Sequence, residues 1–240
     1  MNPSIRCFQL SSLKRRRPQA KPCARTSMKV LITGFDPFGG ESVNPAWEAV
    51  KSLPDHIDGV DVIKVQIPTV FKKSAQKLFE SIEEHRPDAV ICVGQAGGRF
   101  EFCVERIGIN IDDARIPDNE GKQPIDVPIF EDGDSAYFAT LPIKAMVAEA
   151  KKAGVPAAVS NTAGTFVCNH IMYSLLYYIH KHHLPTRGGF VHVPYLTEQV
   201  INKKGVPYMD VATVVRGLEA CIRAIKDNSV DIKVTGGKEF

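Results

Sequence analysis

One cysteine of this sequence, Cys168, stands where a run of small and hydroxyl residues gives way to a helix-like pattern. The stretch reads SNTAGTFVCNH from Ser160 to His170. A thiol at a helix start lies near unbonded backbone N–H groups and the positive end of the helix dipole, which favour the thiolate. Cys168 is therefore a candidate nucleophile.

A nucleophilic cysteine needs a base that takes its proton, and His192 is the histidine with the most unusual setting. It lies within GGFVHVPY, where alternation puts His192 and Phe190 on one face of a strand and the flanking valines on the other. An imidazole buried on such a strand must find a polar partner. Pairing with Cys168 is one hypothesis, and a core histidine bonded to a carbonyl group is the other.

The other six of the seven histidines fit the role less well. His170 follows Cys168 by two positions, which is about 200° around a helix, so the two side chains should diverge. The rest are expected in polar turns or in the last turn of a helix, where cations suit the dipole; they are His56, His85, His180, His182 and His183.

Glu105 is the third candidate for chemistry. If CVERIGINI is extended, Glu105 shares an otherwise apolar face with Cys103 and the three isoleucines of the 107–111 segment. A carboxylate there is costly unless it is paired. It could form a structural ion pair with Arg99 or Arg115, or it could hold an imidazole in the correct tautomer and stabilise its protonated form. The pattern leaves both interpretations open.

Length and composition predict one globular domain. The chain has 240 residues, of which 44% are hydrophobic, enough to bury a full core. No apolar run approaches the roughly 18 residues that span a bilayer, so we expect no membrane segment. Of 30 Lys and Arg residues, seven fall in the first 27 residues, which hold no acid; the other 23 stand against 27 acidic residues. A body with a formal charge near −4 gives little electrostatic support for binding nucleic acid.

The basic segment 1–27 is set apart from the rest of the chain. It is rich in Ser and Arg and lacks the apolar core of a secretory signal peptide. A disordered extension is the simplest interpretation, and organelle targeting or an interaction arm are alternatives. We expect a folded catalytic domain over residues 28–240.

The six cysteines form no C-x-x-C pair and no Cys/His set at zinc spacing, so no metal site is expected. Cys92 and Cys221 fit core positions, and free thiols indicate a reducing compartment such as the cytoplasm.

The glycine clusters DPFGGES and GQAGGRF match no phosphate-binding loop, so they are interpreted as tight turns after strands. Ligands of open α/β sheets bind at such turns.

Strand-like and helix-like segments alternate along the body, which predicts an α/β fold. We expect a single-domain, three-layer α/β/α sandwich with a twisted sheet, mostly parallel or mixed. The segment from residue 123 to residue 142 is expected to be irregular. The predicted strands are MKVLITG, VDVIKVQIP, DAVICVG, PAAVS and GGFVHVPY, with a further strand at the start of FCVERIGINIDDARIPDNEG. The predicted helices begin at Asn44–Pro45 and cover about 71–85, 143–154, 168–183 and 211–225.

Five sequence blocks together resemble the signatures of pyroglutamyl peptidase I, also called pyrrolidone-carboxylate peptidase, a family of cysteine peptidases. They follow the family's order from Met28 to the last helix: ITGFDPFGGESVNP, GQAGG, ERIGINIDDARIPDNEG, SNTAGTFVCNHIMY and GGFVHVPY. The resemblance implies a Glu, Cys and His triad on Glu105, Cys168 and His192. It also implies removal of N-terminal pyroglutamate from peptides through a thioester, no metal or organic cofactor, and a homo-oligomer, often a tetramer.

The substrate-binding residues follow partly from the resemblance and partly from the lactam itself. Pyroglutamate is small and uncharged, so its site should offer apolar walls and a few amide-type hydrogen bonds. The resemblance points to Phe35 and Phe38 as walls, although both could simply pack in the core. Asn44 and Gln95 are candidate polar or loop-positioning contacts, and Arg115 is a candidate support for the oxyanion, with a structural salt bridge as its alternative.

Two other functions fit parts of the pattern. Another thiol amidase, such as a Cys-Glu-Lys amidohydrolase, would need a lysine at the nucleophile, and no lysine stands out in the five blocks. A nucleoside-phosphorylase-like protein or a small-molecule binder would share the scaffold without the peptidase chemistry, because fold alone does not fix function.

Overall fold

The computed structural model describes residues 27–237. The predicted basic extension, residues 1–27, lies outside the described residues apart from Ser27. The first strand begins at Met28, as the sequence predicts. The strands are β1 Met28–Phe35, β2 His56–Ile57, β3 Val60–Ile67, β4 Ala89–Gln95, β5 Phe102–Glu105, β6 Ile107–Ile109, β7 Ala136–Phe138, β8 Ala157–Ser160 and β9 Arg187–Val193. The helices are α1 Pro45–Ser52, α2 Lys73–His85, α3 Ile143–Lys152, α4 Val167–Lys181, α5 Thr197–Val200 and α6 Val211–Asp227.

The main sheet has seven strands in the order β2-β3-β1-β4-β9-β5-β8. Strands β3, β1, β4 and β9 run parallel to one another. Strands β5 and β8 are parallel to each other, but β5 is antiparallel to β9. The predicted mixed sheet is therefore confirmed, and the change of direction occurs between β9 and β5.

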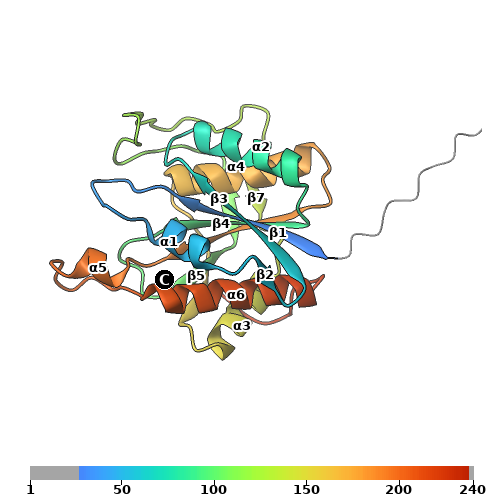
Figure 1. The fold of residues 1–240 in the computed structure, drawn as a ribbon. Coiled ribbons are helices and arrows are strands. Elements are labelled where there is room, and N and C mark those ends of the chain that lie inside the picture. Colours follow the sequence, from blue (N-terminus) through green and yellow to red (C-terminus); the bar gives the residue numbers. More distant parts are fainter. Residues whose placement is uncertain (1–26, 238–240) are drawn as a thin grey trace, which may run out of the picture.

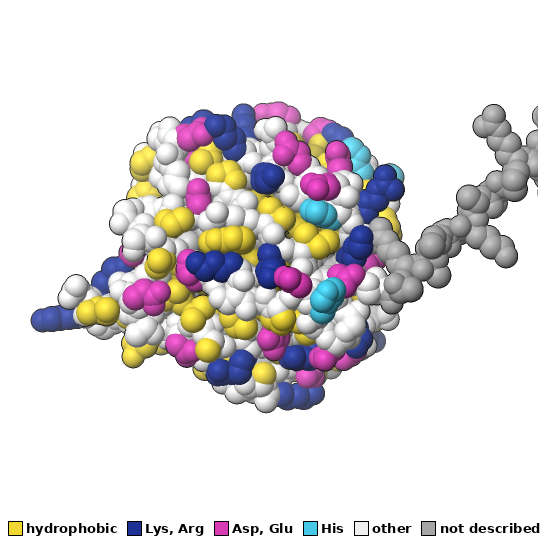
Figure 2. Space-filling view, viewed as in Figure 1, with side chains coloured by type: hydrophobic (Ala, Val, Ile, Leu, Met, Phe, Trp, Pro, Cys, Tyr) yellow, Lys and Arg dark blue, Asp and Glu magenta, His cyan; other side chains and the backbone are white. Residues whose placement is uncertain are grey.

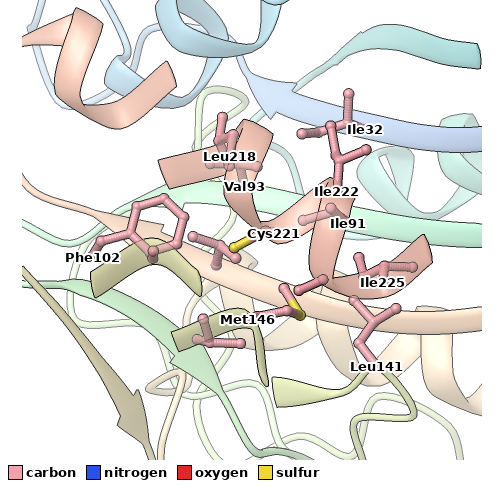
Figure 3. Close-up of a cluster of buried hydrophobic side chains, with 14 of the residues drawn as sticks. Ile32, Ile91, Val93, Phe102, Leu141, Met146, Leu218, Cys221, Ile222 and Ile225 are labelled. Atoms are coloured by element: carbon pink, nitrogen blue, oxygen red, sulfur yellow. The ribbon is translucent and has the colours of Figure 1, made fainter. Parts of the chain in front are cut away.

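Helices cover both faces of the sheet, as Figure 1 shows: α2 and α4 lie on one face, and α3 and α6 on the other. The first core lies under α1, α3 and α6, where Ile91 and Val93 of β4 contact Leu218 and Ile222 of α6 (Figure 3). The second core lies under α2 and α4 and includes Phe190 of β9. This is the three-layer sandwich expected from the alternating pattern.

The segment after Glu105 does not form the one extended strand considered for CVERIGINI. Strand β5 ends at Glu105, and Ile107–Ile109 forms a separate strand that pairs with β7 in a two-stranded sheet. The 123–142 segment, expected to be irregular, contributes β7. The isoleucines therefore do not share the face of Glu105 in the main sheet. This prediction was wrong because a break of direction at a single residue leaves no trace in the hydrophobic pattern.

Acidic and basic side chains are interspersed over the face shown in Figure 2. Within residues 27–237, no helix combines the length and apolarity that crossing a membrane requires. The same part of the chain contains no group of His, Cys, Asp and Glu side chains that could hold a metal ion.

Candidate active site

The antiparallel pairing of β5 with β9 brings Glu105 and His192 together. Cys103 lies opposite His192 in this register, and Glu105 follows two residues later on the same face of the strand. His192 Nδ1 donates to Glu105 Oε1 over 2.7 Å. Because an ionised carboxylate only accepts, this bond fixes the proton on Nδ1 and leaves Nε2 with its lone pair. Within residues 27–237, Nε2 of His192 has no hydrogen-bond partner.

Cys168 is the second residue of α4, at the helix start that the sequence predicts. Its sulfur lies above Gly94 of β4, since a Cβ added at Gly94 would be 2.8 Å from Cys168 Sγ and 2.7 Å from the ring of Phe190. Gly94 is also the strand partner of His192. The glycine therefore makes room for the thiol over the strand position that pairs with His192, near enough for the charge of Glu105 to act on the thiol.

Burial shapes the protonation states of all three groups. Burial lowers the pKa of His192 more than the hydrogen bond and charge of Glu105 raise it, so the imidazole is neutral at pH 7. Burial raises the pKa of Glu105, but the hydrogen bond and charge of His192, followed by Ser160 and Arg99, outweigh it and lower that pKa. Glu105 is therefore ionised although its side chain has 0% exposure.

The pKa of the Cys168 thiol is not the lowered one that a helix start alone suggests. Burial, and then the negative charge of Glu105, raise the pKa of Cys168 to about 12. Removal from water and the charge of Glu105 therefore oppose the effect that the helix dipole has on this thiol. At neutral pH Cys168 is thus a thiol and His192 a neutral imidazole.

Arg99 is a fourth charged group at this site. Its guanidinium donates from Nη1 to Glu105 Oε1 over 2.6 Å, so this oxygen accepts from both Arg99 and His192. Of the two arginines considered as ion-pair partners of Glu105, Arg99 makes the contact, whereas Arg115 is exposed in the segment after β6. The ion-pair and imidazole interpretations of Glu105 both describe the structure.

His170 points away from the chemistry, as predicted from its spacing. Its Nδ1 donates to Asp112 over 2.9 Å, and its Nε2 accepts the backbone N–H of Lys72 over 3.0 Å. Both ring nitrogens are occupied. His170 therefore ties the start of α4 to the loop before α2 and to the segment after β6.

The two predicted wall residues occupy different environments. Phe35 is 2% exposed and belongs to the second core, whereas Phe38 is half-buried in the loop after β1. The Phe38 ring lies 6.2 Å from that of Phe166, which meets Phe71 edge-on at 5.4 Å. Phe166 and Phe71 were missed in the sequence. Phe166 could have been found, because it precedes the helix start that carries Cys168.

The amide candidates are held mainly by the protein itself. Asn44 is 1% exposed; its Oδ1 accepts from Ala46 N as the cap of α1, and its Nδ2 donates to the carbonyl of Asp36. Gln95 at the end of β4 accepts from Gln199 at the α5 segment. The geometry favours loop positioning for Asn44, the second of the two roles considered for it.

The chain is similar to known proteins along most of its length. The sequence profile described as pyroglutamyl peptidase matches residues 28–228. The pyrrolidone-carboxylate peptidase of Clostridium perfringens is 61% identical over 210 residues, which are 88% of this chain and 99% of that protein.

Two solved structures share the fold at full length. The crystal structure of pyroglutamyl peptidase I from Bacillus amyloliquefaciens has a TM-score of 0.85 and 48% identity, covering 87% of this chain and 100% of that one. The pyrrolidone carboxyl peptidase from Thermococcus litoralis has a TM-score of 0.83 and 39% identity, covering 87% and 99%. With a family match over most of its length and relatives of this similarity, the chain belongs to the pyroglutamyl peptidase family, a family of cysteine-type hydrolases.

Proposed function

We propose that this chain removes N-terminal pyroglutamate from peptides, with Cys168 as the nucleophile, His192 as the base and Glu105 as the group that orients His192. The observation that carries the proposal is the surroundings of the His192 ring. Nδ1 is bonded to a buried carboxylate, Nε2 has no hydrogen-bond partner within residues 27–237, and Cys168 Sγ lies over Gly94, the strand partner of His192. Such a ring can take a proton from a thiol. The family of the chain supplies the substrate class.

The reaction begins with proton transfer. His192 Nε2 takes the proton of Cys168 as the sulfur attacks the carbonyl carbon of the pyroglutamyl residue. Within residues 27–237, no hydrogen bond joins Sγ to the ring. The contact tightens when the substrate fills the site, as catalytic hydrogen bonds commonly do. The cost of forming a thiolate with such a raised pKa is met by transferring the proton as the carbon–sulfur bond forms.

The oxyanion of the tetrahedral intermediate needs donors, and the start of α4 offers them. The cap position of this helix is Phe166, whose side chain has no oxygen that could accept from the first N–H groups. A Ser, Thr or Asp at this position would occupy one of those donors. The N–H groups around Cys168 thus serve the oxyanion, with the helix dipole adding to their effect. Arg115 is proposed as a further support.

The second half of the reaction returns the proton. The imidazolium of His192 protonates the leaving amine as the carbon–nitrogen bond breaks, which frees the shortened peptide and leaves a thioester on Cys168. Water, deprotonated by the neutral imidazole, then attacks the thioester carbonyl. The products are free pyroglutamate and the thiol. Glu105 stabilises the imidazolium in both steps through the bond to Nδ1.

Selection of a lactam fits the aromatic loop beside the thiol. Phe38 and Phe166 form a tilted pair of rings at the loop after β1 and at the helix start. We propose that these rings, with Phe35 behind them in the core, pack against the pyroglutamyl ring, and that Gln95 contributes an amide contact. A charged α-ammonium group would lose its hydration against such walls without gaining a counter-charge.

Cleavage of pyroglutamyl-anilide by the full chain and by Cys168→Ala tests the proposal. We expect release of the aniline by the unsubstituted protein and a fall of roughly 10⁴-fold or more in kcat/KM for the variant. Cys221→Ala is the matched control, because this thiol lies on α6 and is buried in the first core, on the face of the sheet opposite Phe190. Full activity of Cys168→Ala would refute the nucleophile. Equal turnover of glutaminyl-anilide would refute lactam selection and favour another thiol amidase.

We also propose that the enzyme acts in the cytoplasm as a homo-oligomer. The cysteines between Ser27 and Gly237 are all free thiols, as a reducing compartment would leave them. The tetramer rests on the resemblance to the family. Light scattering on the purified chain measures the assembly, and a monomer at micromolar concentration would contradict it.

A further inference from the structure

Arg99 links three segments that meet behind the proposed base. It lies in the loop between β4 and β5, and its Nη1 donates to Glu105 Oε1 over 2.6 Å and to Ser160 Oγ over 3.2 Å. Its Nη2 donates to the carbonyl of Thr162 over 2.8 Å. One guanidinium therefore contacts the buried carboxylate of β5, the end of β8, and the loop that leads into α4.

We propose that Arg99 is a positioning residue for the reaction: it acts through Glu105 on His192 and through the 160–162 loop on Cys168. This inference rests on the proposed function. Arg99 lies behind the carboxylate, contacts neither the sulfur nor the imidazole, and is not assigned a part in bond making.

The first part of the argument is the shared oxygen. Glu105 has 0% exposure, and its Oε1 accepts from Arg99 and from His192, while its Oε2 has no hydrogen-bond partner among the described residues. A carboxylate buried with one imidazole alone would face a large cost of removal from water. The guanidinium offsets that cost, so Glu105 stays ionised and remains an acceptor for Nδ1 throughout the cycle.

The second part is electrostatic balance at His192. The charged and titratable groups that face the Glu105–His192 pair are Arg99 from the β4–β5 loop, Cys103 from β5 and Cys168 from α4. Glu105 raises the pKa of His192, whereas Arg99 lowers it. The positive charge of Arg99 thus limits the stability of the imidazolium formed in the reaction. The imidazolium therefore passes its proton readily to the leaving amine.

The third part is the path to the nucleophile. Ser160 Oγ accepts from Arg99 and donates to the carbonyl of Thr162, and Thr162 Oγ1 accepts from Gly164 N. This turn ends four residues before Cys168. The Arg99 guanidinium donates to both Ser160 and Thr162 and thereby fixes where α4 begins. Its forked arrangement of N–H groups allows it to make both bonds.

The test measures kcat, KM and the pH dependence of kcat/KM for Arg99→Met and Arg99→Lys with pyroglutamyl-anilide. For Arg99→Met we expect kcat to fall by about 10- to 100-fold, with KM changed by about twofold or less. The acid limb of kcat/KM should move to higher pH, because the charge that opposes the imidazolium is gone. For Arg99→Lys the charge remains, so the limb should stay near its original pH and kcat should recover in part.

Arg106→Met is the matched control. The Arg106 side chain donates to Asn161 of the 160–162 loop and to the carbonyl of Gly236, but among the described residues it forms no hydrogen bond or ion pair with the Glu105 carboxylate. The Arg106→Met variant should have the kcat of the unsubstituted protein, and the acid limb of its kcat/KM profile should stay at the same pH. If Arg99→Met folds poorly, the role of Arg99 is tested with Arg99→Lys instead. The pH dependence of Cys168 alkylation by iodoacetamide is then a second measurement, because alkylation needs no turnover.

The outcomes separate the two proposals. Absence of activity in the unsubstituted chain contradicts the proposed function. An active chain in which Arg99→Met keeps kcat, or lowers only its melting temperature while the acid limb stays in place, overturns the role of Arg99. A shifted limb in Arg99→Met that Arg99→Lys restores supports it.

Discussion

Two buried imidazole–carboxylate pairs occur within residues 27–237, and they differ in one atom. In both, Nδ1 of the ring donates to an acid: His192 to Glu105, and His170 to Asp112. The Nε2 of His170 accepts a backbone N–H from Lys72, whereas the Nε2 of His192 has no hydrogen-bond partner among residues 27–237, and Cys168 Sγ lies over the neighbouring strand position, Gly94. An imidazole paired with a buried carboxylate thus serves as a structural tie at His170 and is a candidate base at His192.

The comparison shows that burial and a carboxylate partner do not make a histidine a base. What distinguishes His192 is the glycine at its neighbouring strand position, which leaves room for a thiol where a side chain would otherwise pack. At His170 the main chain fills the equivalent space. A base therefore needs an acceptor atom that the fold leaves unsatisfied.

The largest expected difference comes from removing each ring. His192→Ala should lower kcat/KM by about 10³- to 10⁴-fold with a small loss of stability. His170→Ala should instead lower the free energy of unfolding by about 3 kcal/mol, because it leaves the buried Asp112 unpaired, and change kcat less than about tenfold. Steady-state kinetics and urea denaturation measure both. Similar kinetic losses in the two variants would break the comparison.

Replacing the acids by amides should give the next largest effect. Glu105→Gln should lower kcat by about 10²- to 10³-fold, because an amide neither fixes the tautomer of His192 nor stabilises its cation. Asp112→Asn should change kcat by about threefold or less and lower the free energy of unfolding by about 1–2 kcal/mol. Unchanged kinetics of Glu105→Gln would remove Glu105 from the proposed triad.

The role of the space beside His192 can be tested at Gly94. Gly94→Ala forces Cys168 Sγ or the Phe190 ring to move, so kcat should fall by about 10- to 100-fold while the chain stays folded. Gly188→Ala is the control on β9, since its Cβ would meet Ile179 and Leu175 at 2.8 and 3.0 Å. It should lower the melting temperature and leave kcat nearly unchanged. A Gly94→Ala enzyme with full kcat would place the thiol elsewhere.

The smallest effect is a displacement of the pH profile. A base must be neutral, and burial lowers the pKa of His192 from its ordinary value of 6.5. Activity should therefore persist as pH falls to 6.5 and be lost only below it. The acid limb of kcat/KM with pyroglutamyl-anilide reports this pKa in the free enzyme. A limb centred above pH 6.5 would mean that Glu105 dominates over burial.

Local patterns in the sequence predicted most of the fold and singled out Cys168, His192 and Glu105 as candidates, while the triad was implied by the family resemblance. Alternation in GGFVHVPY placed His192 and Phe190 on the face opposite the valines, and the structure has Val191 and Val193 in the first core and Phe190 in the second. The start of α4 at Val167 follows from the change of pattern before Cys168. These features depend on neighbours along the chain, which is why they can be predicted from the sequence.

The rest depends on contacts between distant residues. His170 and Asp112 are 58 residues apart, and the bond from Arg99 to Thr162 spans 63. The transfer of Ile107–Ile109 to a second sheet depends on pairing with β7, which hydrophobicity does not encode. The pKa of Cys168 follows from burial that no local pattern reveals.

Strand β9 has a consequence for how the protein is made. It occupies the middle of the sheet, between β4 and β5, although residues 187–193 leave the ribosome late. Until they emerge, the nascent chain holds β4 and β5 with unpaired edges, which are prone to join other chains. The strand that seals these edges also delivers the imidazole. A polypeptide that stops before residue 187 therefore leaves these strand edges exposed and lacks His192, so under the proposed mechanism it is inactive as a peptidase.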